Sequence, residues 1–343
     1  MIEAAARLFT MSVSICVIGC GVHASVAHGP SLRHYDREES GIVLSACCDI
    51  DATKAADFRQ TFGFRRSYTS IERMLEEETP DALCIILPPE RAAAITSSLA
   101  PRQIPILLEK PPGLTLDDVE MLGDITSRHQ APVQVGFNRR FMPLLARAQR
   151  LLTDLMDPAE IWQVNYDMIR WQRTEADFSI TAIHGLDASG FVARSPAVKA
   201  RFHYQSLPPE TTATAVEVDC ASGALIRCNF LPVAGATLER IAVHGAQTSA
   251  TVDLPIWGSS DTPGLLRLWQ YDTLVLEERG EGGPDYVQWG FAAQMKSFLD
   301  AVKAGAPLRP SLKESAQPVW LMESMRQGLC EASLPSPALQ AQS

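Results

Sequence analysis

The sequence lacks an apolar run of the roughly 20 residues that are needed to cross a bilayer. Residues 12–27 resemble the apolar core of a signal peptide, but the segment before them has no clear positive charge, because Glu3 offsets Arg7. Met11 is an alternative start, which would leave residues 1–10 as a loose extension. We therefore expect a cytoplasmic protein with no membrane partner.

An excess of basic residues is also missing. The 343 residues include 30 Lys and Arg against 40 Asp and Glu, which gives a formal net charge of −10. A negative surface repels nucleic acid, so we expect no nucleic-acid partner. None of the eight cysteines forms a Cys-x-x-Cys pair, and most lie inside apolar, strand-like runs. This pattern favours buried, reduced thiols, and we expect neither a disulfide framework nor a metal site.

The first third of the chain alternates short apolar runs with helical patterns, which is typical of parallel βαβ units. A helical pattern from Ala24 towards Tyr35 is interrupted by Gly29-Pro30, and Asp51 and Ser70 are suited to cap later helices. Strands are predicted at residues 13–18, 42–48, 82–87, 104–108 and 133–137. The pattern predicts a doubly wound parallel sheet over residues 12–137.

After about residue 140 the predicted strands become longer and alternate with a period of two residues, which indicates a sheet with one covered face. We predict an α+β domain over residues 138–332 with a large, mostly antiparallel open sheet. Its last helices are candidates to pack back on the first domain. The strands are predicted at residues 160–170, 198–205, 213–220, 224–230, 241–244 and 250–254, with helices at 143–155, 290–303 and 312–331.

Residues Gly19 to Ala24 read Gly-x-Gly-x-x-Ala between a predicted strand and a predicted helix, the context that a dinucleotide fingerprint requires. Gly19 allows the tight turn, Gly21 lets backbone approach a pyrophosphate, and Ala24 lets the helix pack against the sheet. Asp49 ends the second strand, where an acid can bind the ribose hydroxyls. The motif predicts NAD as the cofactor, with NADP as the alternative.

Three later motifs resemble the Gfo/Idh/MocA family of oxidoreductases: Leu87-Pro88-Pro89, Glu109-Lys110-Pro111, and the segment Val-Gly-Phe-Asn-Arg-Arg-Phe at residues 135–141. The resemblance implies a Rossmann domain followed by a sheet domain, and homodimers or homotetramers. It also implies hydride transfer between nicotinamide and a carbinol carbon of a sugar, inositol or nucleotide sugar. The candidate cofactor contacts beyond the residues already named are Val22, His23, Leu87, Pro88, Glu109, Lys110 and Asn138.

Lys110 and His184 are the candidate catalytic residues. Lys110 follows a buried strand at its carboxyl end, where open α/β sheets bind ligands, and it can hold the substrate oxygen or act as a base. His184 and Asp187 resemble the family's Asp-x-x-x-His-x-x-Asp element, in which the His acts as acid or base. The first Asp is replaced by Ile180, which cannot take a proton.

The remaining substrate candidates are Arg139, Tyr166, Arg170 and Trp171. An arginine together with aromatic rings suits a sugar, although strand aromatics are equally expected to pack within a sheet. Arg139 and its neighbour Arg140 are also typical of ion pairs that bridge two domains. We expect an NAD-dependent dehydrogenase or reductase that acts on a sugar or polyol. The alternatives are an NAD(P)-binding sensor without turnover, which the loss at Ile180 keeps open, and a lyase or hydrolase that uses NAD transiently.

Overall fold

The computed structural model describes residues 12–175, 177–208 and 210–334, so the expectations for residues 1–11 lie outside it. The chain divides into two compact units. Within the described residues, the first unit comprises the chain up to Gly113, together with Asp117–Gly136 and Phe291–Leu312. The second comprises Leu114–Leu116, Phe137–Gly290 and the chain from Lys313 onwards. The segment Phe291–Leu312 thus groups with the N-terminal part of the chain.

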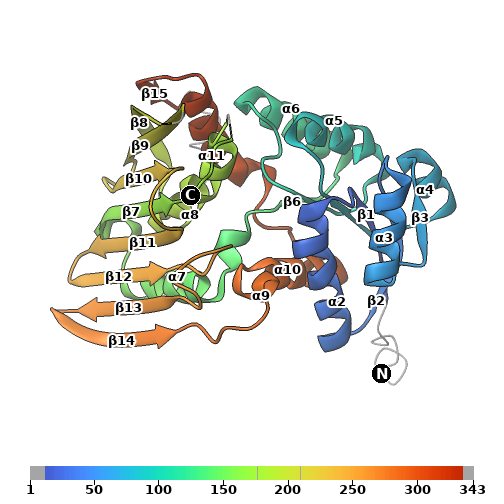
Figure 1. The fold of residues 1–343 in the computed structure, drawn as a ribbon, viewed down its shortest axis with the longest axis horizontal. Helices are drawn as coiled ribbons and strands as arrows, with labels where there is room; N and C mark the ends of the chain where they lie inside the picture. Colours follow the sequence, from blue (N-terminus) through green and yellow to red (C-terminus); the bar gives the residue numbers. More distant parts are fainter. Residues whose placement is uncertain (1–11, 176, 209, 335–343) are drawn as a thin grey trace. The chain divides into compact units, whose positions relative to one another are not determined.

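The first unit contains a six-stranded parallel sheet in the order β3-β2-β1-β4-β5-β6, which confirms the predicted doubly wound architecture (Figure 1). The strand order reverses beside β1, the position at which such sheets bind ligands. The strands are β1 Val13–Ile18, β2 Ile42–Cys48, β3 Arg66–Tyr68, β4 Ala82–Ile85, β5 Ile106–Leu108 and β6 Val133–Val135. The helices are α2 Gly29–Glu38, α3 Ala52–Phe62, α4 Ile71–Glu77, α5 Pro89–Leu99, α6 Leu116–His129 and α10 Phe291–Ala304.

Several local predictions in this unit are confirmed. The Asp51 side chain accepts hydrogen bonds from the amides of Thr53 and Lys54 at the start of α3, and Ser70 caps α4. One prediction is wrong, because Gly29-Pro30 does not interrupt the first helix. A π-helical turn, Ala24–His28, leads directly into α2. Pro30 thus lies inside a continuous helix, where its ring removes one backbone hydrogen bond without ending the helix.

Helix α10 belongs to the first unit because its apolar face completes that unit's core. Met295, Phe298 and Leu299 are fully buried in one cluster with side chains from β1, α2 and α3. At the rim, the Tyr35 hydroxyl of α2 donates to Asp300 at 2.7 Å. This burial removes a large apolar area from water and fixes α10 beside the first helix of the sheet.

The second unit is built on a nine-stranded sheet in the order β14-β13-β12-β11-β7-β10-β9-β8-β15 (Figure 1). All strand pairs are antiparallel except β7 with β10, which confirms the predicted open, mostly antiparallel sheet. The strands are β7 Ile161–Ile169, β8 Ala197–Leu207, β9 Thr211–Cys220, β10 Leu225–Leu231, β11 Leu238–Gly245, β12 Thr248–Asp253, β13 Leu265–Gln270, β14 Thr273–Arg279 and β15 Glu331–Ser333.

The hairpin of β13 and β14 was not predicted. Its two-residue turn is Tyr271-Asp272, with φ of 50° and 60°, and it carries none of the glycine or asparagine that such turns favour. Most side chains of the edge strand β14 are exposed, so burial imposes no alternating pattern on its sequence. Neither of the two usual signals for a hairpin was therefore present.

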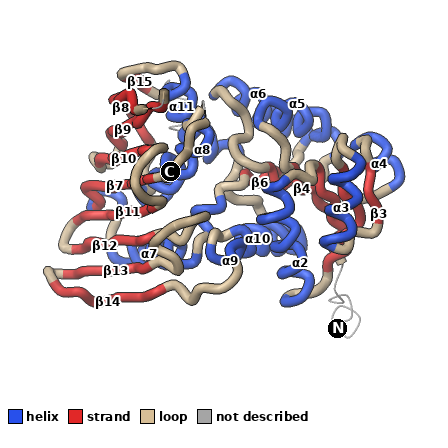
Figure 2. Tube along the Cα trace, in the orientation of Figure 1, coloured by secondary structure: helices blue, strands red, loops and turns tan. Residues whose placement is uncertain are grey.

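Helices cover one face of this sheet (Figure 2). Helix α8, Ser179–Ala193, packs on β7 and β10, and α7, Pro143–Leu155, packs on β12 and β13. Gly185 permits the close approach of α8, because a Cβ there would lie 2.8 Å from the Tyr166 ring. The other helices of the unit are α9 Asp285–Gln288 and α11 Leu312–Arg326.

Among the described residues, no helix has the length and apolar composition needed to cross a membrane.

Two glycines in helices of the first unit test the packing argument. A Cβ at Gly29 would lie 2.6 Å from the Phe62 ring, whereas a Cβ at Gly123 in α6 meets no atom within 4 Å. We expect Gly29→Ala to lower the free energy of unfolding by about 1–3 kcal/mol through overpacking. The matched Gly123→Ala should raise it by about 0.5–1 kcal/mol, because alanine favours helix. Urea unfolding followed by circular dichroism checks both, and equal effects would contradict the packing argument.

Candidate cofactor and substrate sites

The turn after β1 is shaped by two glycines with different surroundings. Gly19 has a φ of 96°, and a Cβ there would lie 2.0 Å from the backbone oxygen of Ile86. This position therefore excludes any side chain. A Cβ at Gly21 meets no protein atom within 4 Å, so the turn is open on that side. A Cβ at Gly19 would also lie 3.3 Å from the Leu87 side chain. Leu87, a predicted cofactor residue, therefore lies beside the turn.

Asp49 lies against the same turn. Its Oδ2 accepts a hydrogen bond from the amide of Cys20 at 2.8 Å, and its Oδ1 accepts one from the amide of Asp51 at 2.9 Å. These bonds fix the carboxylate at the carboxyl end of β2. Two large apolar side chains stay exposed close by in sequence: Val22 is 74% exposed and Ile50 is 81% exposed. Val22 is a predicted cofactor contact, whereas Ile50 is not among the predicted site residues.

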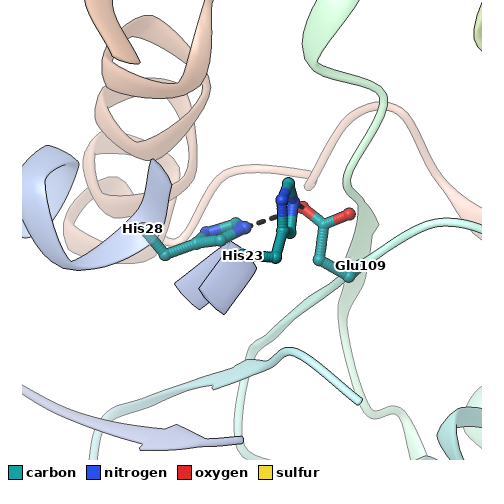
Figure 3. Close-up of side chains that lie close together, drawn as sticks. All are labelled: His23, His28 and Glu109. Atoms are coloured by element: carbon teal, nitrogen blue, oxygen red, sulfur yellow. Dashed lines mark hydrogen bonds and ion pairs between the residues drawn. The ribbon is translucent and has the colours of Figure 1, made fainter. Parts of the chain in front are cut away.

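A cluster of two imidazoles and one carboxylate lies behind the turn (Figure 3). Oε1 of Glu109 lies 2.7 Å from Nε2 of His28 and 3.5 Å from Nε2 of His23. Oε2 of Glu109 accepts the amide of Lys110 at 3.1 Å. A Cβ at Gly136 would lie 2.9 Å from the Glu109 carboxylate, so glycine is required there. The Glu-Lys-Pro and Val-Gly-Phe motifs therefore meet at this carboxylate.

The surroundings favour an ionised Glu109 beside a neutral His28. Burial alone raises the pKa of Glu109, but His23 and His28 together bring it well below its usual range. For His28, which is 1% exposed, burial lowers the pKa and outweighs the contact with Glu109. A neutral imidazole can still donate one N–H to the carboxylate.

His28 was missed in the sequence because of the π-helical turn. His23 and His28 are five residues apart, and their rings contact each other edge to face at 5.5 Å. An α-helix brings together residues three or four apart, whereas a π-turn, with its i to i+5 hydrogen bonds, brings together residues five apart. A search at the α-helical period therefore does not relate these two histidines.

The remaining predicted cofactor residues are distributed over both units. Pro88 precedes α5, and Lys110 follows β5 with a half-buried side chain. Asn138 is fully buried in the second unit, where its Nδ2 donates to the backbone oxygen of Trp289 at 2.9 Å and its Oδ1 accepts from Arg139 at 3.3 Å. The cofactor contact of Asn138 stays a prediction, since its amide already has these partners.

His184 and Asp187 lie one turn apart on α8, and both are buried. The carboxylate of Asp187 is held by Arg140, whose Nη2 lies 2.6 Å from Oδ1, and Arg140 also contacts Glu314 at 3.1 Å. Burial raises the pKa of Asp187, and the Arg140 guanidinium opposes this shift. The arrangement favours a structural ion pair, and the predicted substrate contact of Asp187 stays a prediction.

Asp177 is the nearest acid before Ile180 in the sequence, and its carboxylate has other partners. Asp177 lies before the first residue of α8, accepts the amide of Ser179 at 3.0 Å and pairs with Arg326 at 2.7 Å. Asp177 therefore accepts the first amide of α8 and joins the start of that helix to α11.

Three predicted substrate residues share one buried partner, Glu239 of β11, which is 0% exposed. Arg139 reaches its carboxylate at 3.0 Å, and Arg170 and Tyr166 also bond to it. Tyr166 is fully buried, as the sheet-packing alternative expected, whereas Trp171 is 59% exposed just after β7. Glu239 was missed because nothing in its sequence neighbourhood distinguishes it from a surface strand residue.

The ionisation of Glu239 should contribute strongly to the change in the second unit's free energy of unfolding at acid pH. Arg139 and Arg170 lower its pKa to about 2 from 4.5 in spite of burial. Because the pKa is lower in the folded state, this stabilisation is complete above pH 4.5 and is lost as the pH falls towards 2. Such a shift corresponds to about 3 kcal/mol.

We therefore expect Glu239→Gln to lower the free energy of unfolding at neutral pH by about 3–5 kcal/mol, since two buried arginines lose their partner. The free energy of unfolding of Glu239→Gln should also fall less steeply than that of the wild type between pH 5 and pH 2. The control is Glu217→Gln, which breaks a partly exposed pair with Arg227 and should cost less than about 1 kcal/mol. Denaturant unfolding across this pH range is the measurement, and a steep acid transition retained in Glu239→Gln would refute the assignment.

Comparison with known proteins places this geometry in context. Residues 13–137 match the model of the Gfo/Idh/MocA oxidoreductase family, for its NAD-binding Rossmann fold. The chain is 31% identical over 80 residues to the rhizopine catabolism protein MocA of Rhizobium meliloti, a match that covers 23% of this chain and 25% of that protein.

Two further similarities extend over most of the chain. The myo-inositol 2-dehydrogenase of Thermotoga maritima is 21% identical over 314 residues, covering 85% of this chain and 89% of that protein. The crystal structure of an oxidoreductase domain protein from Kribbella flavida superposes with a TM-score of 0.80 at 17% identity, covering 95% of this chain and 100% of that one. Both units therefore have the fold of this group of proteins.

Proposed function

Starting from its membership of the Gfo/Idh/MocA family of NAD-binding oxidoreductases, we propose that this chain oxidises a CH–OH group of a polyol or sugar, or reduces the matching ketone, with NAD as the hydride acceptor or donor. An inositol-like ring is the first substrate to test, because a myo-inositol 2-dehydrogenase is similar over most of the chain. We also propose that it acts in the cytoplasm as a homodimer or homotetramer.

The observation that carries this proposal is the open glycine turn beside Asp49. The turn excludes a side chain at Gly19, leaves free space at Gly21 and holds a carboxylate at the end of β2. A dinucleotide requires such a combination: backbone that a diphosphate can approach, and an acid for the ribose hydroxyls. The same carboxylate disfavours the 2′-phosphate of NADP. Gly19, Gly21, Val22, Ala24, Leu87 and Asp49 are the residues that we propose to hold the cofactor.

Bound NAD supplies the carbon that takes up or releases the hydride. We propose that Lys110 holds the substrate oxygen and favours negative charge on it, and that His184 exchanges the hydroxyl proton. The position of Lys110 supports its role, since it follows β5 at the ligand-binding edge of the sheet. Without an acid at position 180, these two residues share the proton transfer. Trp171, exposed just after β7, is proposed to contact the substrate ring.

Cofactor choice is tested by fluorescence titration with NADH and NADPH. We expect NADH to bind more tightly, because the Asp49 carboxylate accepts from a ribose hydroxyl and repels a phosphate. Asp49→Asn should weaken NADH binding about tenfold or more, since hydrogen bonds to a charged group are worth about 1.5–3 kcal/mol. The control Asp57→Asn changes an exposed acid on α3 and should bind as wild type does. If neither nucleotide binds to the wild-type chain, the proposal fails.

Catalysis is tested by single-turnover reduction of bound NAD⁺ with myo-inositol and a panel of related polyols. We expect Lys110→Ala and His184→Ala to slow hydride transfer about 10²-fold or more. NADH affinity should be unchanged in His184→Ala. The control Lys199→Ala removes a surface lysine of β8 and should leave the rate unchanged.

The same experiment separates the alternatives. A chain that binds NADH but transfers no hydride to any polyol or sugar would be a sensor, which the isoleucine at position 180 favours. Conversion of a sugar without net NADH would identify a lyase or hydrolase that oxidises and re-reduces its substrate.

A further inference from the structure

The side chains of His23, His28 and Glu109 form a cluster in the first unit. Each residue offers one ligand atom, and these three atoms all lie within 4.8 Å of one another (Figure 3). From Oε1 of Glu109, the two imidazole nitrogens lie at 2.7 Å and 3.5 Å. Ligand atoms that share one tetrahedral zinc ion at 2.0–2.1 Å are about 3.3 Å apart. We propose that these three side chains bind a divalent transition metal ion, with Zn²⁺ as the preferred ion.

The cluster is open to solvent on one side. The side chain of His23 is 47% exposed, which gives the ion a route from solvent and leaves room for water in the remaining positions.

The ligand residues are oriented by a second layer of contacts, as in established metal sites. Nδ1 of His28 lies 3.6 Å from Sγ of Cys84, and the amide of Lys110 donates to Oε2 of Glu109 at 3.1 Å. The ring of Phe291 contacts the edges of both histidine rings, at 5.3 Å for His23 and 5.5 Å for His28. These contacts hold both imidazoles and the carboxylate in the orientation that brings their ligand atoms together.

The chemical nature of the three ligand atoms determines which metal ion the cluster prefers. Two imidazole nitrogens and one carboxylate oxygen suit Zn²⁺ or Co²⁺, whereas Mg²⁺ and Ca²⁺ prefer oxygen ligands throughout. Cys84 faces the other nitrogen of His28 and is therefore assigned outside the ligand set. The proposal thus predicts a Co²⁺ spectrum with d–d bands and no sulfur-to-metal charge-transfer band.

The test uses tag-free, full-length protein that has been freed of metal with a chelator. Zn²⁺ affinity is measured by competition with a chromophoric chelator, and Co²⁺ binding by visible absorption. The wild-type chain should bind one ion, and His23→Ala should weaken binding about tenfold or more. Because His23 is half exposed, its removal leaves no core cavity. The matched control is His129→Ala, an exposed histidine at the end of α6, which should bind as wild type does.

Glu109→Gln gives a second, independent variant, since an amide oxygen is a poor zinc ligand, and it should also lose the Co²⁺ bands. Circular dichroism establishes that each variant is folded before binding is measured. Unchanged affinity in His23→Ala, or no stoichiometric binding by the wild-type chain, would overturn the proposal and leave a hydrogen-bonded pair that only supports the turn. None of these readouts depends on NAD or on turnover, so such a failure would leave the proposed function untouched.

Discussion

The need to compensate buried carboxylates organises this protein. A carboxylate without partners in the interior would cost several kcal/mol, so the chain around it must supply donors or cations. In the first unit, Glu109 meets this need with His28, His23 and its neighbouring backbone amide. These partners come from the helix after the glycine turn and from the end of β5. The charge requirement of one side chain therefore joins the segments that carry the candidate cofactor and catalytic residues.

The second unit repeats the principle twice. Glu239 gathers Arg139, Arg170 and Tyr166, and Asp187 is held by Arg140. Arg139 and Arg140 belong to the short helical segment Asn138–Phe141, which is thereby anchored to β11 and to α8. Residues that resemble substrate ligands in sequence thus act mainly as internal ion pairs. Among the proposed substrate contacts in this unit, His184 and Trp171 are the ones outside these ion pairs.

The isoleucine at position 180 is a further position at which a polar group expected from the family resemblance is missing. Asp177 does not substitute for the missing acid, because its carboxylate accepts the first amide of α8 and pairs with Arg326. A dehydrogenase with one proton-transfer group fewer depends more strongly on a lysine that stabilises charge on oxygen. The same loss would be harmless in a protein that binds NAD without turnover, so the isoleucine is compatible with both functions and only the hydride-transfer assay separates them.

The sequence by itself determined the parts of this protein that depend on local chemistry. The order of strands β1, β2, β4, β5 and β6, the caps at Asp51 and Ser70, and the glycine turn all follow from neighbouring residues. The short edge strand β3, Arg66–Tyr68, was not predicted. The open antiparallel sheet followed from alternation in the central strands, where one face is buried. The β13–β14 hairpin could not be predicted, because its edge strand is exposed and its turn lacks glycine.

Only the tertiary structure decided which charged groups meet. Glu239 is about 70 residues away from Arg170 and 100 from Arg139, and Glu109 is 81 residues away from His28, so no spacing rule relates them. The π-turn that aligns His23 with His28 departs from the α-helical period. The physical reason is that local propensities act over a few residues, whereas the cost of burying a charge is met by whichever partners the completed fold brings within bonding distance.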